Sequence, residues 1–527
     1  MISSLSHLTR LVRTGYVLAR EGVFALVDTR ALPLPERTFI AMARLIERPT
    51  TKAGTKDDSG RLAAALTKLG PTYVKLGQFM ATRPDVVGVP IAKSLESLQD
   101  RMPPFPQSEA EAVIVAAFDR PLNATYASLG PSVAAASIAQ VHKAEIDIAG
   151  ERKTVAVKVL RPGIERRLNA DLDAFFFAAR TAEKMSTEAQ RLRPVEAVAT
   201  LARSVKIEMD FRLEAAAASE MAENTKDDPN FRVPTVDWDR TAREVLTLEW
   251  IDGTPLNDRA TLEERGLDLP ALGRNVIQSF LRHALRDGFF HADMHPGNLF
   301  VDADGKLVAV DFGIMGQLGP KERRFLAEIL YGFITRDYHR VAQVHFDAGY
   351  VPRHHSVADF AQAIRAIGEP IHNRTAEDIS MAKLLMLLFE VTGLFDMRTR
   401  PELLLLQKTM VVVEGVARTF DPKLDMWATA DPVVREWIAR HLGPAGKLEG
   451  AFEGAGELGR FAAQVPALLH RAGSILDQID DATRNGIVLA PESVEAIGRS
   501  EARHNRWVAG GLWMIALMLG WIAWLLV

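Results

Sequence analysis

The residues best suited to chemistry lie between positions 290 and 313, where the chain reads FHADMHPGNLFVDADGKLVAVDFG. His291 is followed two positions later by Asp293, and Asn298 comes five positions after that. Asp311 opens an Asp-Phe-Gly triplet thirteen positions further on. Phosphoryl transfer needs one carboxylate to orient or deprotonate the nucleophile, and an amide and a second carboxylate to hold Mg²⁺ on the phosphates. We therefore predict Asp293 as the catalytic carboxylate and Asn298 and Asp311 as metal ligands.

A β-hairpin is predicted to carry these groups. Two short apolar runs, 298–301 and 307–310, are joined by Asp-Ala-Asp-Gly at 302–305, and such a turn between β-prone runs is typical of a hairpin. Taken singly, each acid or amide could merely cap a turn, sit in a bend or end a strand. The motif positions and the hairpin between them favour the catalytic interpretation as a set.

The pattern H-x-D-x-x-x-x-N followed by D-F-G resembles the protein-kinase-like superfamily, and HADMHPGN resembles the UbiB family of atypical kinase-like proteins of ubiquinone biosynthesis. Ala292 stands where protein kinases have the Arg that binds a phosphorylated activation loop, and His295 stands where they have Lys. After Gly313 the chain passes through Gly319-Pro320 into a helical pattern at 321–332 without an A-P-E segment. These departures from ordinary protein kinases predict that the chain has no platform for a peptide substrate and no control by activation-loop phosphorylation.

A second set of motifs precedes this region. Lys75 and Gln78 are three positions apart, so they share one face of a helix, and the spacing alone indicates a solvated face. PTYVKLGQ, RPD and LQDRMPPF between positions 71 and 105 resemble the family's own N-terminal extension. The resemblance implies that the K-x-G-Q helices lie over the active site, with Lys75 and Gln78 facing the nucleotide and its metal. That arrangement would suppress protein-kinase activity and favour ATPase or small-molecule chemistry.

A nucleotide-binding lobe is predicted from about position 123. The segment PSVAAASIAQVH at 131–142 lies where a glycine-rich phosphate loop belongs, and small residues let backbone N–H groups approach phosphates. An alanine run by itself indicates only helix propensity, but this one resembles the alanine-rich nucleotide loop of the UbiB family, and Ser137 adds a hydroxyl donor. The residues that the resemblance implies for ATP binding are Val133, Ala134, Ala135, Ala136, Ser137, Ile138, Ala139, Gln140 and Val141.

Lys158 lies inside the β-branched run TVAVKV at 154–159, a V-A-x-K pattern. A lysine in a buried strand needs an anionic partner, and here the partners would be the α- and β-phosphates and a helix carboxylate. The alternative is a lysine on an edge strand that faces water.

The helix that should supply the carboxylate is predicted over 195–223 as one long helix. Glu214 matches the acid that pairs with the strand lysine in the family, and Glu208 and Asp210 match the family's E-x-D. Residues six apart are about 600° apart around a helix, so Glu208 and Glu214 would face different partners. We assign Glu214 to Lys158, and Glu208 and Asp210 to the K-x-G-Q side.

The strand and turn at 245–253 fit the hinge between two lobes, where backbone groups near Glu249 and Ile251 would hold the adenine of ATP. An apolar helix at 269–287 leads into the catalytic loop, and the chain beyond Gly332 is predicted to be helical to about Arg440.

Composition bounds the class of protein. The 527 residues are 25% charged and 48% apolar, which is typical of globular chains with two or three domains. A net charge of -4 and a pI near 6.4 give no general attraction to nucleic acid. Cysteine is absent from the sequence, which excludes disulfides, thiolate metal sites and cysteine nucleophiles.

The last 21 residues, 507–527, carry no charge. As a helix, this segment would be long enough to cross a hydrocarbon core of roughly 30 Å. Tryptophans lie near both ends, and Arg503, His504 and Arg506 precede the segment, so the basic flank is expected on the cytoplasmic side. A buried core helix is the alternative.

We therefore predict an α/β (α+β) bilobal, kinase-like fold with a helical K-x-G-Q extension and a C-terminal transmembrane helix. The domains predicted are 1–120 for the extension, 121–253 and 254–440 for the two lobes, 441–505 for a helical tether and 506–527 for the membrane span.

The resemblance, which covers about residues 60–420, implies a membrane-anchored ATPase that supports ubiquinone biosynthesis, with ATP and Mg²⁺ as cofactors. Its expected location is the cell inner membrane, with the kinase-like domain in the cytoplasm. Ubiquinone precursors or other lipid-like ligands and other quinone-biosynthesis proteins are the expected partners. A protein or small-molecule kinase with an unidentified acceptor, and a nucleotide-binding scaffold without catalysis, remain open.

Overall fold

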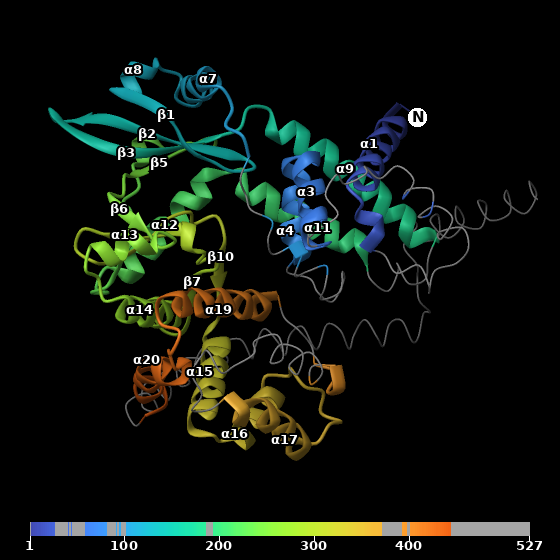
Figure 1. The fold of residues 1–527 in the computed structure, drawn as a ribbon, viewed down its shortest axis with the longest axis vertical. Coiled ribbons are helices and arrows are strands. Elements are labelled where there is room, and N and C mark those ends of the chain that lie inside the picture. Colours follow the sequence, from blue (N-terminus) through green and yellow to red (C-terminus); the bar gives the residue numbers. More distant parts are fainter. Residues whose placement is uncertain are drawn as a thin grey trace, which may run out of the picture. The chain divides into compact units, whose positions relative to one another are not determined.

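The computed structural model describes residues 2–26, 58–81, 102–185, 193–371, 393–397 and 401–443, with the single positions 41, 44, 91, 94, 95, 98 and 391. The chain divides into two compact units, Met1–Ile438 and Ala439–Val527, and the site described below belongs to the first. Figure 1 labels the elements of the fold. The predicted span at 506–527 lies outside the described residues, as do residues 444–505 of the predicted tether. Among the residues that are described, no helix combines the length and the apolar character needed to cross a membrane.

Four antiparallel strands form the small lobe, in the order β1-β2-β3-β5. Val155, Val157 and Val159 lie on one buried face of β3, and Lys158 lies on the other, because side chains alternate along a strand. The valines share a core with Ile114 of the covering helix α7. The elements are α7 (Gln107–Phe118), α8 (Leu122–Thr125), β1 (Ser128–Ala135), β2 (Ala139–Ile148), β3 (Glu151–Leu160), η2 (Trp238–Arg240) and β5 (Val245–Glu249).

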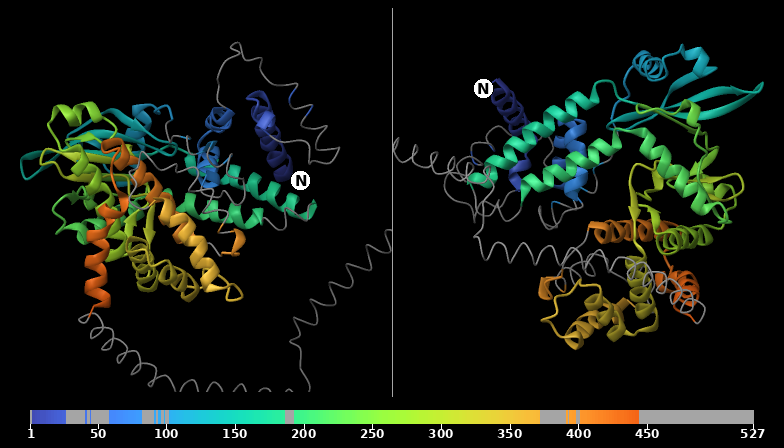
Figure 2. Two further views of the ribbon diagram at one scale, coloured as in Figure 1. Left: turned by 60° about the horizontal axis from the view of Figure 1, so that its bottom comes forward. Right: turned by 180° about the vertical axis from the view of Figure 1, so that it is seen from behind.

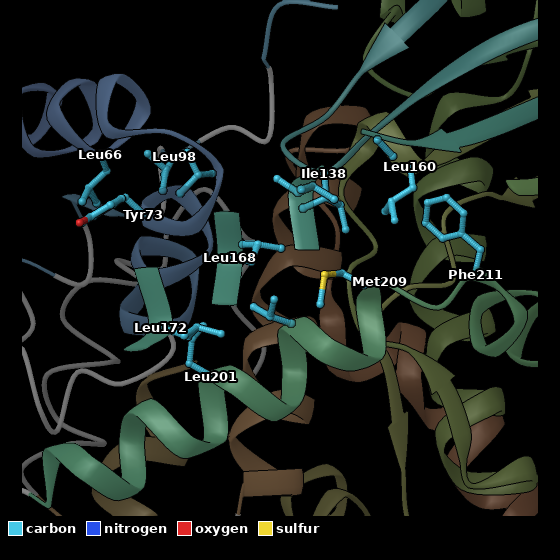
Figure 3. Close-up of a cluster of buried hydrophobic side chains, with 14 of the residues drawn as sticks. Leu66, Tyr73, Leu98, Ile138, Leu160, Leu168, Leu172, Leu201, Met209 and Phe211 are labelled. Atoms are coloured by element: carbon cyan, nitrogen blue, oxygen red, sulfur yellow. The ribbon is translucent and has the colours of Figure 1, made fainter. Parts of the chain in front are cut away.

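The N-terminal helices and the small lobe share one apolar cluster (Figure 3). Leu66 and Tyr73 from the extension, Leu201 from α11, Ile138 between β1 and β2, and Phe211 at the start of α12 are all buried in it. Figures 1 and 2 show α9 and α11 side by side, with α3 and α4 against them. The elements are α1 (Ile2–Arg20), η1 (Val23–Leu26), α3 (Asp58–Leu69), α4 (Pro71–Ala81), α9 (Ile164–Met185) and α11 (Pro194–Glu208).

A buried carboxylate on α9 holds the extension in place. The hydroxyl of Thr72 on α4 donates to Oδ2 of Asp171 (2.6 Å), and Arg10 on α1 donates to Oδ1 of the same group (2.6 Å). The ring of Tyr73 packs edge-on against Phe175 of α9, with 5.1 Å between ring centroids. Three helices are therefore joined by both polar and apolar contacts at one place.

The prediction of one long helix over 195–223 is wrong. The chain forms α11, an interruption, and then α12 (Phe211–Thr225). Asp210 has an extended backbone (φ −117°, ψ 93°), and its carboxylate accepts a hydrogen bond from the N–H of Arg212, which caps the new helix. Apolar residues continue at helical spacing through the interruption, so periodicity alone does not reveal it.

The large lobe contains the predicted hairpin, which the structure confirms: β8 pairs with β9 antiparallel, Leu299 opposite Ala309. Asp302 closes the turn by accepting from the N–H groups of Asp304 (3.1 Å) and Lys306 (2.9 Å). The sheets are β4-β9-β8-β6 and β10-β7. Their strands are β4 (Phe231–Arg232), β6 (Gly253–Pro255), β7 (Phe289–His291), β8 (Leu299–Asp302), β9 (Leu307–Ala309) and β10 (Met315–Gln317).

Helices surround these strands, and α19 lies along α14 (Figures 1 and 2). Gly273 of α14 permits the close approach, because a Cβ there would lie 3.0 Å from the carbonyl oxygen of Ala417. The helices are α13 (Arg259–Glu264), α14 (Leu269–Arg282), η3 (His283–Asp287), η4 (Pro296–Asn298), α15 (Pro320–Thr335), α16 (Tyr338–Asp347), α17 (Val357–Gly368), η5 (Glu369–Ile371), α19 (Pro401–Phe420) and α20 (Met426–Leu442). Two lobes, each built from strands and helices, are thus connected by the turn that follows β5.

Candidate active site

Asp293 and Asn298 are held together in the loop between β7 and β8. The side-chain amide of Asn298 donates to the backbone oxygen of Asp293 (3.1 Å) and to its carboxylate Oδ2 (3.2 Å). Because the nitrogen of this amide is used on Asp293, the side-chain oxygen is the group that Asn298 has left for a cation. His295 caps the short η4 turn between them by accepting from the N–H of Gly297 (3.2 Å).

His291 braces this loop against the strand that leads to Asp311. Its Nδ1 accepts from the N–H of Asp293 (3.1 Å), and its Nε2 lies 3.2 Å from the carbonyl oxygen of Val310. The proton of the neutral ring must therefore sit on Nε2, where it can be donated to Val310. The ring is buried and packs edge-on against Phe312, with 5.5 Å between centroids. One imidazole thus fixes both carboxylate-bearing segments.

Asp311 has a positive φ of 64°, which is uncommon for a residue with a side chain and indicates local strain. Its Oδ1 lies 3.1 Å from the ammonium of Lys158. Loss of hydration alone would raise the pKa of Asp311, but the charge and hydrogen bond of Lys158 outweigh it, and Lys75 adds a smaller effect. The pKa is lowered to about 2, so the carboxylate is ionised at neutral pH.

Lys158 also pairs with Glu214 of α12. Its ammonium lies 2.7 Å and 3.0 Å from the two carboxylate oxygens, and 5.4 Å above the ring of Phe211. Burial alone would lower the pKa of Lys158, but the charges of Asp311 and Glu214 raise it instead, so the ammonium is retained. For Glu214, burial dominates, and the pKa is raised to about 7 in spite of Lys158. Of the two acids that share the lysine, Asp311 keeps its negative charge more readily.

The extension contributes a second buried ion pair. Nζ of Lys75 on α4 lies 2.6 Å from Oε2 of Glu208 at the end of α11, and each side chain is only 12% exposed. Gln78, one turn further along α4, is half-buried. Asp210 does not join this pair, because it caps α12 and its carboxylate is bound by the guanidinium of Arg212 (2.7 Å). Glu208 and Glu214 face different partners because they lie on different helices.

The alanine-rich segment forms the end of the β1–β2 hairpin. Val133, Ala134 and Ala135 lie in β1; Ala136, Ser137 and Ile138 form the connection; Ala139, Gln140 and Val141 begin β2. The side chain of Ser137 is fully buried, and that of Gln140 is bonded to the backbone of Phe105 on both sides (2.9 and 3.3 Å). The segment that enters α7 therefore holds the hairpin in place. The backbone of the hairpin remains the predicted phosphate contact.

At the predicted hinge, the carboxylate of Glu249 is already used. It accepts from Arg232 (3.0 Å) and from the backbone and hydroxyl of Thr235 (3.2 Å each). Ile251 follows two positions later, outside β5 and before β6. The adenine contact predicted for this segment therefore depends on its backbone groups.

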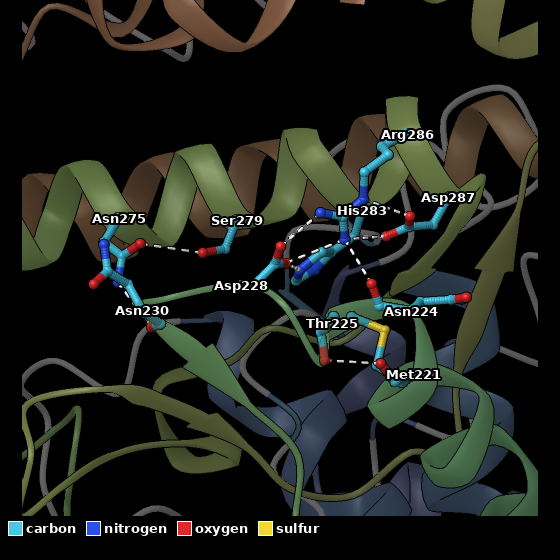
Figure 4. A network of polar contacts seen from close by, with 10 residues as sticks. All are labelled: Met221, Asn224, Thr225, Asp228, Asn230, Asn275, Ser279, His283, Arg286 and Asp287. Carbon is cyan, nitrogen blue, oxygen red and sulfur yellow. Dashed lines mark hydrogen bonds and ion pairs between the residues drawn. The ribbon is translucent and has the colours of Figure 1, made fainter.

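A polar network that was not predicted from the sequence joins α12 and the residues after it to η3, which precedes β7 (Figure 4). Asp228, after α12, accepts from His283 (3.1 Å) and Arg286 (2.5 Å) in the turn before β7. Burial would raise the pKa of Asp228, but these two donors lower it to about 2. Arg286 also bonds the carbonyl oxygen of Asn224 and the carboxylate of Asp287. The helix that carries Glu214 is thereby tied to η3, which leads through β7 to Asp293.

One contact in the large lobe was not predicted from the sequence. The hydroxyl of Thr409 on α19 lies 3.0 Å from the backbone oxygen of Ala292, so α19 contacts the segment that carries Asp293. After Asp311 the chain pairs β10 with β7 and enters α15 at Pro320, as expected for a chain without an A-P-E segment.

Comparisons with known proteins agree with this geometry. Residues 97–345 match the family described as the ABC1 atypical kinase-like domain, and residues 364–425 match the UbiB helical domain. The chain is 39% identical over 473 residues to a "Probable protein kinase UbiB" of Marinobacter nauticus, covering 89% of this chain and 85% of that one. A protein of the same name from Azotobacter vinelandii is 40% identical over 394 residues, covering 74% and 73%.

Among solved structures, the chain resembles the Rv3197 protein of Mycobacterium tuberculosis, determined as a complex with erythromycin. The TM-score is 0.51 and the identity 25%, over 76% of this chain and 98% of that one. The family match and this likeness together give the two lobes a kinase-like α/β fold.

Proposed function

Because the chain belongs to the UbiB family of atypical kinase-like proteins, we propose that it is an ATPase that supports ubiquinone biosynthesis at a membrane. ATP and Mg²⁺ are the proposed cofactors. The observation that carries the proposal is the convergence of Lys158 on both Glu214 and Asp311, beside the bonded pair Asp293 and Asn298. These groups come from four separate segments and are the set that phosphoryl transfer requires.

Each group has a role that follows from its chemistry. Lys158 would bind the α- and β-phosphates while Glu214 keeps its ammonium in place. Asp311 is ionised at neutral pH, so together with the side-chain oxygen of Asn298 it offers the hard oxygen ligands that Mg²⁺ prefers. Mg²⁺ bound there would neutralise charge on the phosphates. Asp293 would orient a water molecule and accept its proton as the bond to the leaving ADP breaks.

The position of the N-terminal extension favours hydrolysis of ATP, or phosphoryl transfer to a small acceptor, over phosphorylation of a peptide. The buried pair Lys75–Glu208 fixes the extension next to the site, and the charge of Lys75 already acts on Asp311. We propose that Lys75, Gln78 and Glu208 form a cover over the nucleotide, with Asp210 as the cap that turns the chain between Glu208 and Glu214. The printed name of the relatives, "Probable protein kinase UbiB", keeps a kinase with an unidentified acceptor as the second candidate.

We further propose that residues 506–527 anchor the protein in the cell inner membrane, with the kinase-like lobes in the cytoplasm. The support is the uncharged 21-residue run at 507–527 with a basic flank. An anchored ATPase suits a pathway whose intermediates stay in the bilayer. Ubiquinone precursors, similar lipid-like ligands and other quinone-biosynthesis proteins are the proposed partners, and the domain boundaries given above are proposed with them.

The test is Mg²⁺-dependent phosphate release by the full chain in lipid vesicles. Asp293→Asn removes the proposed catalytic carboxylate, and Asp304→Asn is the matched control, because Asp304 is an exposed aspartate in the turn of the neighbouring hairpin. We expect release from the wild type and the control to be equal, and release from Asp293→Asn to fall by about 10²- to 10³-fold, as is typical for loss of a catalytic acid–base group.

Labelled ATP separates the remaining candidates. Transfer of the label to a lipid or protein in the vesicles, rather than to water, would replace the ATPase by the kinase. Nucleotide binding with no release from any of the three proteins would replace it by the non-catalytic scaffold.

A further inference from the structure

Two histidines and one aspartate meet on the surface of the large lobe, away from the site above. His354 and His355 lie in the turn between α16 and α17, and Asp396 lies 41 positions after His355. The Nε2 atoms of His354 and His355 are 3.7 Å and 3.2 Å from the same carboxylate oxygen, Oδ2 of Asp396. One ligand atom from each residue lies within 4.8 Å of the other two.

The spacing fits a tetrahedral cation. Zinc binds imidazole nitrogen and carboxylate oxygen at about 2.0–2.2 Å, so two of its ligands are separated by about 3.4 Å. The two nitrogen–oxygen distances, 3.2 and 3.7 Å, lie on either side of that value. All three ligand atoms lie within 4.8 Å of one another, so these groups could close on one cation, with water completing the tetrahedron.

The convergence is not explained well by an ordinary ion pair. An ion pair needs only one ring, whereas both rings approach the same carboxylate oxygen, and their centroids are only 4.1 Å apart. A divalent cation accounts for this arrangement, because two imidazole nitrogens and one carboxylate oxygen can bind it together.

The segments that carry the ligands are held by the core. Phe395, next to Asp396, is buried, lies 5.3 Å from the ring of His355 and packs edge-on against Phe360 of α17 at 4.9 Å. The N–H of His355 donates to the carbonyl oxygen of Pro352 (3.2 Å). His355 and the residue before Asp396 are thus positioned by packing, whereas the side chains of His354 and Asp396 are exposed (66% and 68%).

We propose that His354, His355 and Asp396 form a binding site for a zinc-class divalent cation, which links the turn before α17 to the segment at 393–397. Two imidazoles favour Zn²⁺, Co²⁺ or Ni²⁺ over Mg²⁺ and Ca²⁺, which prefer oxygen ligands. The site is independent of the proposed ATPase chemistry. Its role is structural: the cation joins two segments that lie far apart in the sequence.

Zinc binding to the untagged, chelator-treated full chain tests this proposal, with millimolar Mg²⁺ present to fill oxygen-ligand sites. The variants are His354→Ala/His355→Ala and Asp396→Asn, and the matched control is His339→Ala, an exposed histidine on the neighbouring helix α16. We expect one Zn²⁺ per wild-type chain with a Kd on the order of micromolar. Affinity should fall at least tenfold in both variants and stay unchanged in the control.

Thermal unfolding provides a second measurement of zinc binding. Zinc at roughly 100 times its Kd should raise the Tm of the wild type by roughly 3–5 °C and that of the two site variants by much less. Equal zinc binding by wild type and both variants would overturn the proposal, as would the absence of bound zinc at 100 µM, about 100 times the expected Kd. A Tm shift that Mg²⁺ reproduces would also overturn it.

Discussion

Replacing Lys158 with methionine removes the cation that Glu214 and Asp311 share, while keeping most of the volume of the side chain. The ammonium is bonded to both oxygens of Glu214 at 2.7 and 3.0 Å and to Asp311 at 3.1 Å. After the substitution, two carboxylates face each other without a positive charge between them. Glu214 is the more affected, because only 7% of its side chain is exposed, against 48% for Asp311.

The size of the effect follows from this burial. Removing one partner of a buried ion pair typically costs 3–5 kcal/mol, whereas an exposed pair contributes about 0–1 kcal/mol. The buried Lys158–Glu214 contact therefore accounts for most of the loss, and we expect Lys158→Met to lower the free energy of unfolding by about 3 kcal/mol at pH 8. Lys158→Met/Glu214→Gln removes the stranded charge as well and should recover at least half of that loss.

The loss should depend on pH, because the pKa of Glu214 is raised from 4.5 to about 7 by burial. An acid with a raised folded-state pKa stabilises the fold fully below its unfolded pKa, and that contribution is lost as the pH rises through the folded pKa. Without Lys158 the pKa of Glu214 rises further, so the lost stability appears over a higher and wider range. The difference between wild type and Lys158→Met should therefore be small near pH 5 and grow toward pH 9.

Urea unfolding followed by circular dichroism at pH 5, 7 and 9 measures these differences. Lys153→Met is the control, since Lys153 is an exposed lysine on the same strand, and it should change the free energy of unfolding by less than about 0.5 kcal/mol. A loss for Lys158→Met that is the same at all three pH values, or a double variant no more stable than the single one, would refute the reasoning.

Two further predictions concern the extension and the strand after the catalytic loop. A double-mutant cycle on Lys75→Met and Glu208→Gln should give a coupling of about 1–3 kcal/mol in the free energy of unfolding, because the pair is buried; a coupling below about 0.3 kcal/mol would show that it contributes nothing. Gly316→Ala should cost about 1–3 kcal/mol, because the new Cβ would lie 2.1 Å from the ring of Phe290. Gly415→Ala, where a Cβ meets no atom within 4 Å, should stabilise α19, and equal Tm values for the two glycine variants would contradict the steric argument.

Much of the site could be predicted because its residues are close in sequence or part of a strong pattern. The hairpin between Asn298 and Asp311 follows from a turn sequence between two β-prone runs, and the structure confirms it. The contact of Lys158 with Glu214, which are 56 positions apart, was expected from the resemblance to the UbiB family, and the two groups meet at 2.7 Å. The hairpin thus follows from a short stretch of sequence, and the ion pair from the match of two motifs to a family.

What could not be predicted depends on contacts between distant segments that no motif marks. Asp228 meets His283 across 55 positions, and Thr409 reaches Ala292 across 117, and neither pair has a local pattern that distinguishes it from a surface acid or a helical threonine. The break at Asp210 is different, since an Asp before a helix is a known capping signal. Because apolar residues continue at helical spacing on both sides of Asp210, the pattern favoured one helix, and the capping role of Asp210 was not predicted.

The apolar cluster of Figure 3 has a consequence for how the chain can fold during synthesis. Leu66 and Tyr73 are made early, but their partners Ile138, Leu201 and Phe211 follow as many as 145 positions after Leu66. The first helices therefore cannot complete their packing until the small lobe has left the ribosome. A chain shortened to begin at residue 97, where the family domain starts, would leave one side of that lobe open to water and is expected to aggregate.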